Sequence, residues 1–264
     1  LEGGRFWYRV RTAAGSDWVI VDPAAGTVDR SADSTRLLAA SRGDERVGRD
    51  EVVSPDGRKA AFIRAHDLWV RDLATGRETR LTTDGVEDFG YATNNAGWTK
   101  SDRPVLLWSP DSRRIATFQH DARGVGDMYL VSTEVGHPAL EAWKYPLPED
   151  TVIFRIHRVV IDLEAPGGAK VTRLRMDPDQ HRSTVCDHVV CRGLGWADVE
   201  WLDDGSMLAF VSSSRDHKVA TLRVADPATG EVRDVHTERV PTFYESGYRA
   251  QNWRVLPSSN EFLW

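Results

Sequence analysis

The stretch VSPDGRKAAFIRAHDLWVRDLATGRETRLT, residues Val53 to Thr82, decides the fold. Its Pro-Asp-Gly triplet predicts a tight turn, because Pro and Asp favour the early turn positions and Gly closes the turn. The apolar run at residues 59–63 and the alternating run at residues 68–73 predict two strands, since alternation with period two is typical of a half-buried strand. A second turn at residues 74–78 and an outer strand at 79–82 complete an expected antiparallel meander.

The same pattern returns twice in the chain. Its copies are WSPDSRRIATFQHDARGVGDMYLVST (Trp108–Thr133) and WLDDGSMLAFVSSSRDHKVATLRVADPATGEVRDVHTE (Trp201–Glu238), with weaker copies at the two ends. The turn signals recur roughly every 50 residues, which is a period typical of repeat architectures. One gap is near twice as long, and residues 133–196 hold either a diverged copy or a long insertion. Repeated units of four short strands predict an all-β fold, a β-propeller.

Tryptophan and charge content agree with a soluble propeller. The chain has 10 Trp, and we expect most of them, including Trp69, Trp108 and Trp201, to fill the space between stacked blades. The formal net charge is −6 with scattered Lys and Arg, so we expect no nucleic-acid partner and no anionic membrane partner. No apolar run has the length of a membrane span, and the N-terminus lacks the pattern of a signal peptide.

The only cysteines are Cys186 and Cys191, with His188 between them. This spacing resembles half of a zinc site, but no second Cys or His pair follows at the distances that structural zinc sites use. We therefore expect two small loop residues or a local disulfide, no metal and no cofactor.

The segments between the repeats add a family resemblance. GVEDFGYATNNAGW (Gly85–Trp98), AWKYPLPEDTVIFRIHRVVIDL (Ala142–Leu163) and GWADVEW (Gly195–Trp201) follow one another in an order that resembles the N-terminal propeller of the dipeptidyl peptidase IV family, serine peptidases of family S9. The resemblance implies an eight-bladed propeller that caps a C-terminal α/β-hydrolase domain with a Ser-Asp-His triad. Residues 1–264 would be about four to five blades of it, cut at both ends, with an inter-blade insertion at 84–107.

The catalytic machinery itself is not expected in this chain. No G-x-S-x-G nucleophile elbow occurs in it, and no His or Asp stands in the context that a triad needs. We nominate no catalytic residue and expect the chain to be inactive alone, although its parent is expected to be a serine-type dipeptidyl peptidase or oligopeptidase.

The insertion is where the resemblance implies substrate binding. In the family it carries two adjacent glutamates that hold the free α-amino group of a peptide, because an ammonium that loses water needs carboxylates around it. Alignment places this pair near Asp102 and Arg103, of which one is acidic. Glu87, Asp88, Asp102 and Glu245 are the candidate substitutes. The structural alternative is that Asp102 caps a turn and that Glu87 and Asp88 are solvated.

An arginine is a second candidate for substrate binding. The family uses one from the first hairpin to bind the substrate carbonyl, and Arg11 matches better than Arg9. A guanidinium there would offer two donors. The resemblance further implies the hydrolase domain as a partner, leaves a homodimer open, and favours a periplasmic or secreted parent.

Two functions remain open from the sequence. The first is a substrate-gating propeller that binds the N-terminus of short peptides for a peptidase. The second is a non-catalytic propeller, as in TolB-like proteins, that serves as a platform for protein binding. A five-bladed glycosidase would need two placed carboxylates, and the sequence offers no pair to nominate.

Overall fold

The computed structural model describes residues 6–12, 15–31, 47–48, 50–93, 101–133, 135–180, 195–244, 251–259 and 261–264. Every helix or strand assigned in these residues is a β-strand, which confirms the predicted all-β class. None of the described segments forms a helix that could cross a membrane. The chain divides into two compact units, residues 1–48 and 49–264, and each is described by itself.

The first unit contains a three-stranded antiparallel sheet. Its strands follow one another in chain order as β1 (Phe6–Thr12), β2 (Gly15–Asp22) and β3 (Thr27–Ser31). Gly26 closes the turn between β2 and β3 with φ +65°, a backbone conformation that favours glycine. The weak first copy of the repeat therefore forms three strands of a blade.

The quoted stretch forms the predicted meander. Its four strands are β4 (Val52–Val53), β5 (Lys59–Arg64), β6 (Asp67–Asp72) and β7 (Glu78–Arg80), paired in that order. Gly57 donates its N–H to the carbonyl of Ser54 at 2.9 Å and has φ +70°, so it closes the first turn as the Pro-Asp-Gly triplet predicts. Ala60 and Ala61 are buried on either face of β5.

The last repeat copy forms a second four-stranded meander. It consists of β15 (Val199–Trp201), β16 (Leu208–Ser213), β17 (Val219–Ala225) and β18 (Val232–Arg239), again in chain order. Two further strands, β19 (Arg254–Leu256) and β20 (Glu261–Leu263), pair with each other.

The middle sheet is built around one long strand. Its members are β8 (Phe89–Tyr91), β9 (Leu107–Trp108), β10 (Arg114–Asp121), β13 (Arg155–Asp162) and β14 (Lys170–Arg173). On one side β10 pairs with β13 along its full length. On the other side β9 and β8 pair with successive halves of β10. Both ends of the 84–107 segment are therefore fastened to the same strand.

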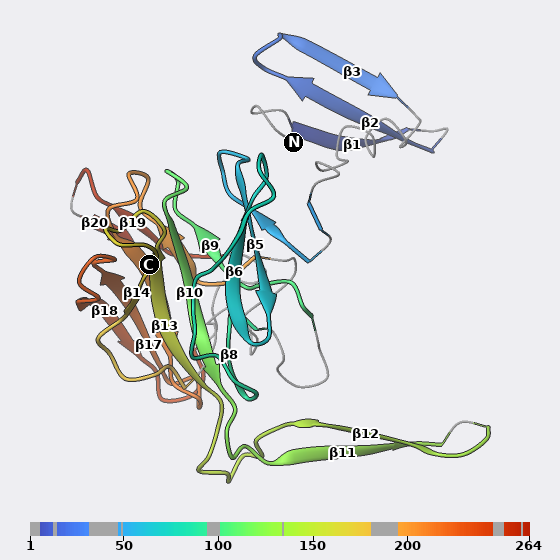
Figure 1. Ribbon diagram of the computed structural model, residues 1–264, viewed down its shortest axis with the longest axis vertical. Helices are drawn as coiled ribbons and strands as arrows, with labels where there is room; N and C mark the ends of the chain where they lie inside the picture. Colours follow the sequence, from blue (N-terminus) through green and yellow to red (C-terminus); the bar gives the residue numbers. More distant parts are fainter. Residues whose placement is uncertain are drawn as a thin grey trace. The chain divides into compact units, whose positions relative to one another are not determined.

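The middle copy of the repeat departs from the expected meander. If Trp108–Thr133 followed the pattern of the first copy, residues 127–132 would form the next strand of this sheet, but they do not. β11 (Asp127–Ser132) instead pairs with β12 (Ala139–Lys144) in a separate two-stranded ribbon, here called the arm. Figure 1 shows the arm extending beyond the strands of the middle sheet. The doubled gap thus contains an insertion, and β13 takes the place in the sheet.

Neighbouring sheets of the second unit pack through shared apolar clusters. One cluster joins Ala61 and Leu68 of the first meander to Ile115 of the middle sheet. The next joins Phe118 of the middle sheet to Phe210 of the last meander. Antiparallel sheets that stack in chain order through their faces are the arrangement of propeller blades.

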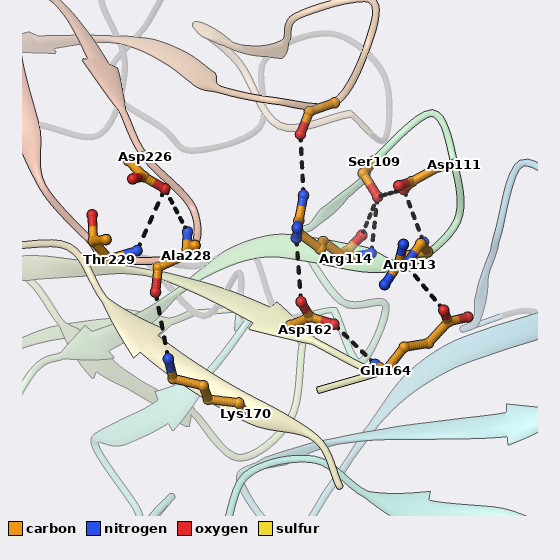
Figure 2. Close-up of polar contacts among 11 residues, drawn as sticks. Ser109, Asp111, Arg113, Arg114, Asp162, Glu164, Lys170, Asp226, Ala228 and Thr229 are labelled. Atoms are coloured by element: carbon orange, nitrogen blue, oxygen red, sulfur yellow. Dashed lines mark hydrogen bonds and ion pairs between the residues drawn. The ribbon is translucent and has the colours of Figure 1, made fainter. Parts of the chain in front are cut away.

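Polar contacts also connect the middle sheet to the last meander (Figure 2). The Arg114 guanidinium donates to the carbonyl of Gly205 at 3.3 Å and lies 3.4 Å from the carboxylate of Asp162. Lys170 donates to the carbonyl of Ala228 at 3.4 Å. Arg114 and Lys170 thus bind backbone carbonyls in turns of the next blade.

Two of the three tryptophans named above are confirmed as blade core. Trp108 and Trp201 are buried, and each indole N–H donates at 3.1 Å to a carbonyl of the preceding blade, that of Val52 and Leu107 respectively. Trp69 is only half-buried, and it stacks on Phe62 of the adjacent strand within the same sheet. The repeated tryptophan at the start of a blade therefore connects that blade to the preceding one by a hydrogen bond.

We expect Trp201→Phe to lower the free energy of unfolding by about 1 kcal/mol more than Trp69→Phe. Both changes remove an indole. The Trp201 N–H has a hydrogen-bond partner, whereas the buried Trp69 N–H has none in the part of the chain that the structure describes. The measurement is urea unfolding of the full-length protein followed by tryptophan fluorescence. Equal effects would show that the N–H to carbonyl contact adds nothing to blade packing.

Candidate functional site

A cavity of about 710 Å³ lies where the 84–107 segment, the first meander and the base of the arm meet. Its walls come from the β5–β6 turn, the loop before β8, residues 101–102 and the end of β10. The start of β11 and the end of β12, both at the base of the arm, complete them. The cavity therefore depends on the insertion, which the sequence singles out, and on the arm, which the sequence does not indicate.

Glu87 and Asp88 form the tip of a tight turn at the cavity. Val86 and Phe89 close this turn with two backbone hydrogen bonds, of 3.2 and 3.0 Å. Asp88 has φ +60°, a conformation that Asp tolerates better than most residues. The Asp88 carbonyl accepts the N–H of Ala122 at 2.8 Å, so the turn is tied to the end of β10. Both residues line the cavity.

A buried aspartate holds the start of this loop. Asp67 is fully buried and accepts the N–H of Gly85 at 3.0 Å, the hydroxyl of Thr82 at 2.7 Å, and the guanidinium of Arg80. Gly85 passes so close to the β5–β6 turn that a Cβ there would lie 2.3 Å from the carbonyl oxygen of His66. The hydrogen bonds of Asp67 therefore position the loop, and the lack of a side chain at Gly85 allows its close approach to the β5–β6 turn.

Tyr91 anchors the other end of the loop. Its N–H donates to the carbonyl of His66 at 2.8 Å, and its hydroxyl donates to the carboxylate of Asp84 at 2.8 Å. Burial raises the pKa of Tyr91, and the neighbouring Asp84 raises it further. The phenol thus stays protonated and keeps its hydrogen bond to Asp84.

The two positions aligned with the glutamate pair have different environments. Asp102 is exposed and lines the cavity. Arg103 does not line it, and its guanidinium donates to the carbonyl of Glu51 at 2.8 Å. The structure therefore brings Asp102 together with Glu87 and Asp88.

Sequence reasoning missed the contribution of the arm. Asp127 and Lys144 face each other in its register, and Lys144 Nζ lies 3.4 Å from Asp127 and 3.9 Å from Asp88. Trp143 also lines the cavity. The only signal in the sequence is an acid at the start of one strand-like run and a base at the end of the next. This signal is weak unless the pairing of the two strands is known.

Two histidines that the sequence did not nominate complete the lining. His66 lies in the β5–β6 turn with φ +69°, and its neighbour Ala65 also has a positive φ of +50°. His120, on β10, is buried and packs against Phe154 with the rings tilted and their centroids 5.0 Å apart. Positive φ at both central residues is the geometry of a type I′ hairpin turn, and it brings His66 to the cavity wall.

The charges of the lining favour a cation. It holds four carboxylates and one ammonium, a formal charge of −3 with neutral histidines. Paired carboxylates bind an ammonium by charge-assisted hydrogen bonds, which are stronger than neutral ones. In the part of the chain that the structure describes, no three His, Cys, Asp or Glu side chains are placed to hold a metal ion.

The remaining candidates lie elsewhere. Arg11 is on β1 opposite Ser16, with an exposed side chain, in the unit that does not hold the cavity. Glu245, Cys186, His188 and Cys191 fall outside the described residues.

The stacked sheets and their inter-blade ties define a partial β-propeller. The chain matches the family model of the dipeptidyl peptidase IV (DPP IV) N-terminal region over residues 8–264, and it belongs to this family. The resemblance carried by the 85–98, 142–163 and 195–201 segments is thereby confirmed.

Known relatives agree with this assignment. The chain is 23% identical over 222 residues to the probable dipeptidyl-aminopeptidase B of Aspergillus clavatus, covering 78% of this chain and 23% of that relative. Among solved structures, Porphyromonas gingivalis dipeptidyl peptidase 4 superposes with a TM-score of 0.52 at 17% identity, covering 90% of this chain and 30% of that one. A putative dipeptidyl aminopeptidase IV from Bacteroides ovatus also gives 0.52, at 16% identity, covering 90% and 29%. At these identities the structures establish the propeller fold.

Proposed function

We propose that this chain forms the wall of a substrate chamber in a serine peptidase of family S9 and that its cavity binds the free N-terminus of a short peptide. The observation that carries the proposal is the convergence of Glu87, Asp88 and Asp102 on one cavity. The family supports the peptidase context, and the relatives are named as dipeptidyl peptidases or aminopeptidases.

The proposal assigns different tasks to the propeller and to the catalytic domain. In this proposal the propeller excludes folded proteins by size and holds the peptide amine, whereas acyl transfer belongs to an α/β-hydrolase domain of the full-length protein. Holding the amine at a fixed distance from the nucleophile would decide which peptide bond is cut. The positioning of the reacting groups in the bound complex accounts for a large part of the reduction in the activation barrier.

The test is hydrolysis by the full-length protein of X-Pro and X-Ala chromogenic dipeptides with free or acetylated N-termini. We expect Asp102→Asn to lower kcat/KM for the free substrates by about tenfold, because it removes one charge-assisted contact with the ammonium. Blocked substrates should be cleaved poorly by both proteins.

The matched control is Asp203→Asn, since Asp203 is 96% exposed and does not line the cavity. It removes the same charge and should leave kcat/KM unchanged. Equal cleavage of free and blocked substrates by the wild type would contradict amine binding and would make the parent an endopeptidase or oligopeptidase.

The alternative is a non-catalytic propeller that serves as a binding platform. The insertion and the acidic cavity weigh against it, because a plain platform needs neither. A full-length protein without a G-x-S-x-G elbow, or without any hydrolysis of the free substrates, would favour the platform.

A further inference from the structure

Lys144 is the one Lys or Arg side chain among the described residues that line the cavity. It lies at the base of the arm, the last residue of β12, directly opposite Asp127. Its side chain is 29% exposed, so its ammonium is partly desolvated and still reachable from the cavity. The arm therefore brings a cation into a site whose other charges are negative.

The four carboxylates of the cavity are not equivalent. Asp127 and Asp88 share the Lys144 ammonium, at 3.4 and 3.9 Å. Glu87 and Asp102 form no ion pair with any Lys or Arg in the residues that the structure describes. Two acids are thus already engaged by the protein, and two are open to a ligand.

We propose that Lys144 determines the charge specificity of the cavity for the first residue of the peptide. Its ammonium engages Asp88 and Asp127, which leaves Glu87 and Asp102 for the α-ammonium. The site then matches a first residue with an uncharged side chain. Without Lys144, the freed pair would bind the second cation of a peptide that begins with Lys or Arg. This inference rests on the proposed function of the cavity.

A purely structural role for Lys144 is disfavoured by how the arm is held. Six residue pairs join β11 to β12, and the N–H of Tyr145 donates to the carbonyl of Gly126 at 2.8 Å just beyond Lys144. The backbone therefore fixes the base of the arm without the ammonium. Lys144→Met keeps an unbranched apolar stem of similar length and removes only the charge.

The experiment compares two peptides that differ by one charge on the first residue. Binding of Ala-Ala and Lys-Ala to the full-length protein, measured by isothermal titration calorimetry, gives a ratio of dissociation constants that does not require catalysis. The same ratio is measured as kcat/KM with the chromogenic Ala-Pro and Lys-Pro substrates. The matched control is Lys170→Met, which removes a lysine on β14 that does not line the cavity.

We expect Lys144→Met to shift both ratios toward the lysine peptide by about fivefold, the range of one solvent-accessible ion pair, and Lys170→Met to leave them unchanged. The shift should shrink as ionic strength rises, since it is electrostatic. An unchanged binding ratio in Lys144→Met would overturn the proposal, as would an equal weakening of both peptides. Absent hydrolysis together with a shifted binding ratio would overturn the peptidase function and keep the specificity role of Lys144.

Discussion

Asp179→Ala should destabilise the contact between β13 and the last meander by about 3 to 5 kcal/mol, the cost of leaving a buried charge without its partner. The charge is the guanidinium of Arg158 on β13, whose side chain is 1% exposed. Its Nε donates to Asp179 at 2.6 Å, and the group lies over the ring of Phe210 with 4.3 Å to the centroid. Its Nη1 has no hydrogen-bond partner among the described residues even in the wild type. Water cannot replace the carboxylate at such a site without opening it.

Local stability is measured by hydrogen exchange of the full-length protein, on peptides that cover β13 and β16, because β16 supplies the Val211 carbonyl that faces Arg158 at 3.4 Å. The control is the double variant Arg158→Met with Asp179→Leu, which removes both charges and should cost less than Asp179→Ala alone. A single variant that exchanges no faster than the double variant would show that the ion pair is hydrated.

Gly85→Ala should displace the turn that carries Glu87 and Asp88. The new Cβ would lie 2.3 Å from the His66 carbonyl oxygen and 2.8 Å from an Asp67 carboxylate oxygen, and neither neighbour can move freely. His66 O is bonded to the Tyr91 N–H, and Asp67 is fully buried. Overpacking of this kind costs about 1 to 3 kcal/mol. A shift of about 1 Å at a positioning group lowers kcat/KM by about a hundredfold.

The matched control is Gly126→Ala, next to Asp127 at the base of the arm. No atom of the described residues lies within 4 Å of the Cβ it would add, and its φ is not positive, so the change should be nearly neutral. The readouts are kcat/KM of the full-length protein for free dipeptide substrates and hydrogen exchange of residues 84–91. Equal activity of the two variants would mean that the Glu87–Asp88 turn does not position the substrate.

Predicting the fold depended on local chemistry. The turn at Ser54–Gly57 and the alternation in β5 and β6 are properties of neighbouring residues, and the structure confirms both. The same reasoning failed for residues 127–132, since Tyr129 and Leu130 read as a blade strand but are more than half exposed on the arm. Alternation reports that a segment is extended, and it does not say which strand is its partner.

The acids of the site could be nominated from the sequence, but their grouping could not. Glu87, Asp88 and Asp102 were named from the insertion, whereas Asp127 and Lys144 reach the cavity only through the register of β11 on β12. Arg103 follows Asp102 in the sequence, yet its guanidinium binds the carbonyl of Glu51, which lies 52 residues earlier in the chain. Which of two neighbours faces a cavity depends on contacts between segments roughly 50 residues apart, the spacing of one blade.

The sequence by itself determined the all-β class, the blade repeat and the family, because turn residues, period-two alternation and segment order are written along the chain. The tertiary structure alone decided that β8 and β9 share one edge of β10, and that the arm leaves the middle sheet. It also decided that a lysine enters an acidic cavity. These features arise from pairing and packing between distant segments. A charged side chain contributes to specificity only when such packing sets its distances from the other charged groups of the site.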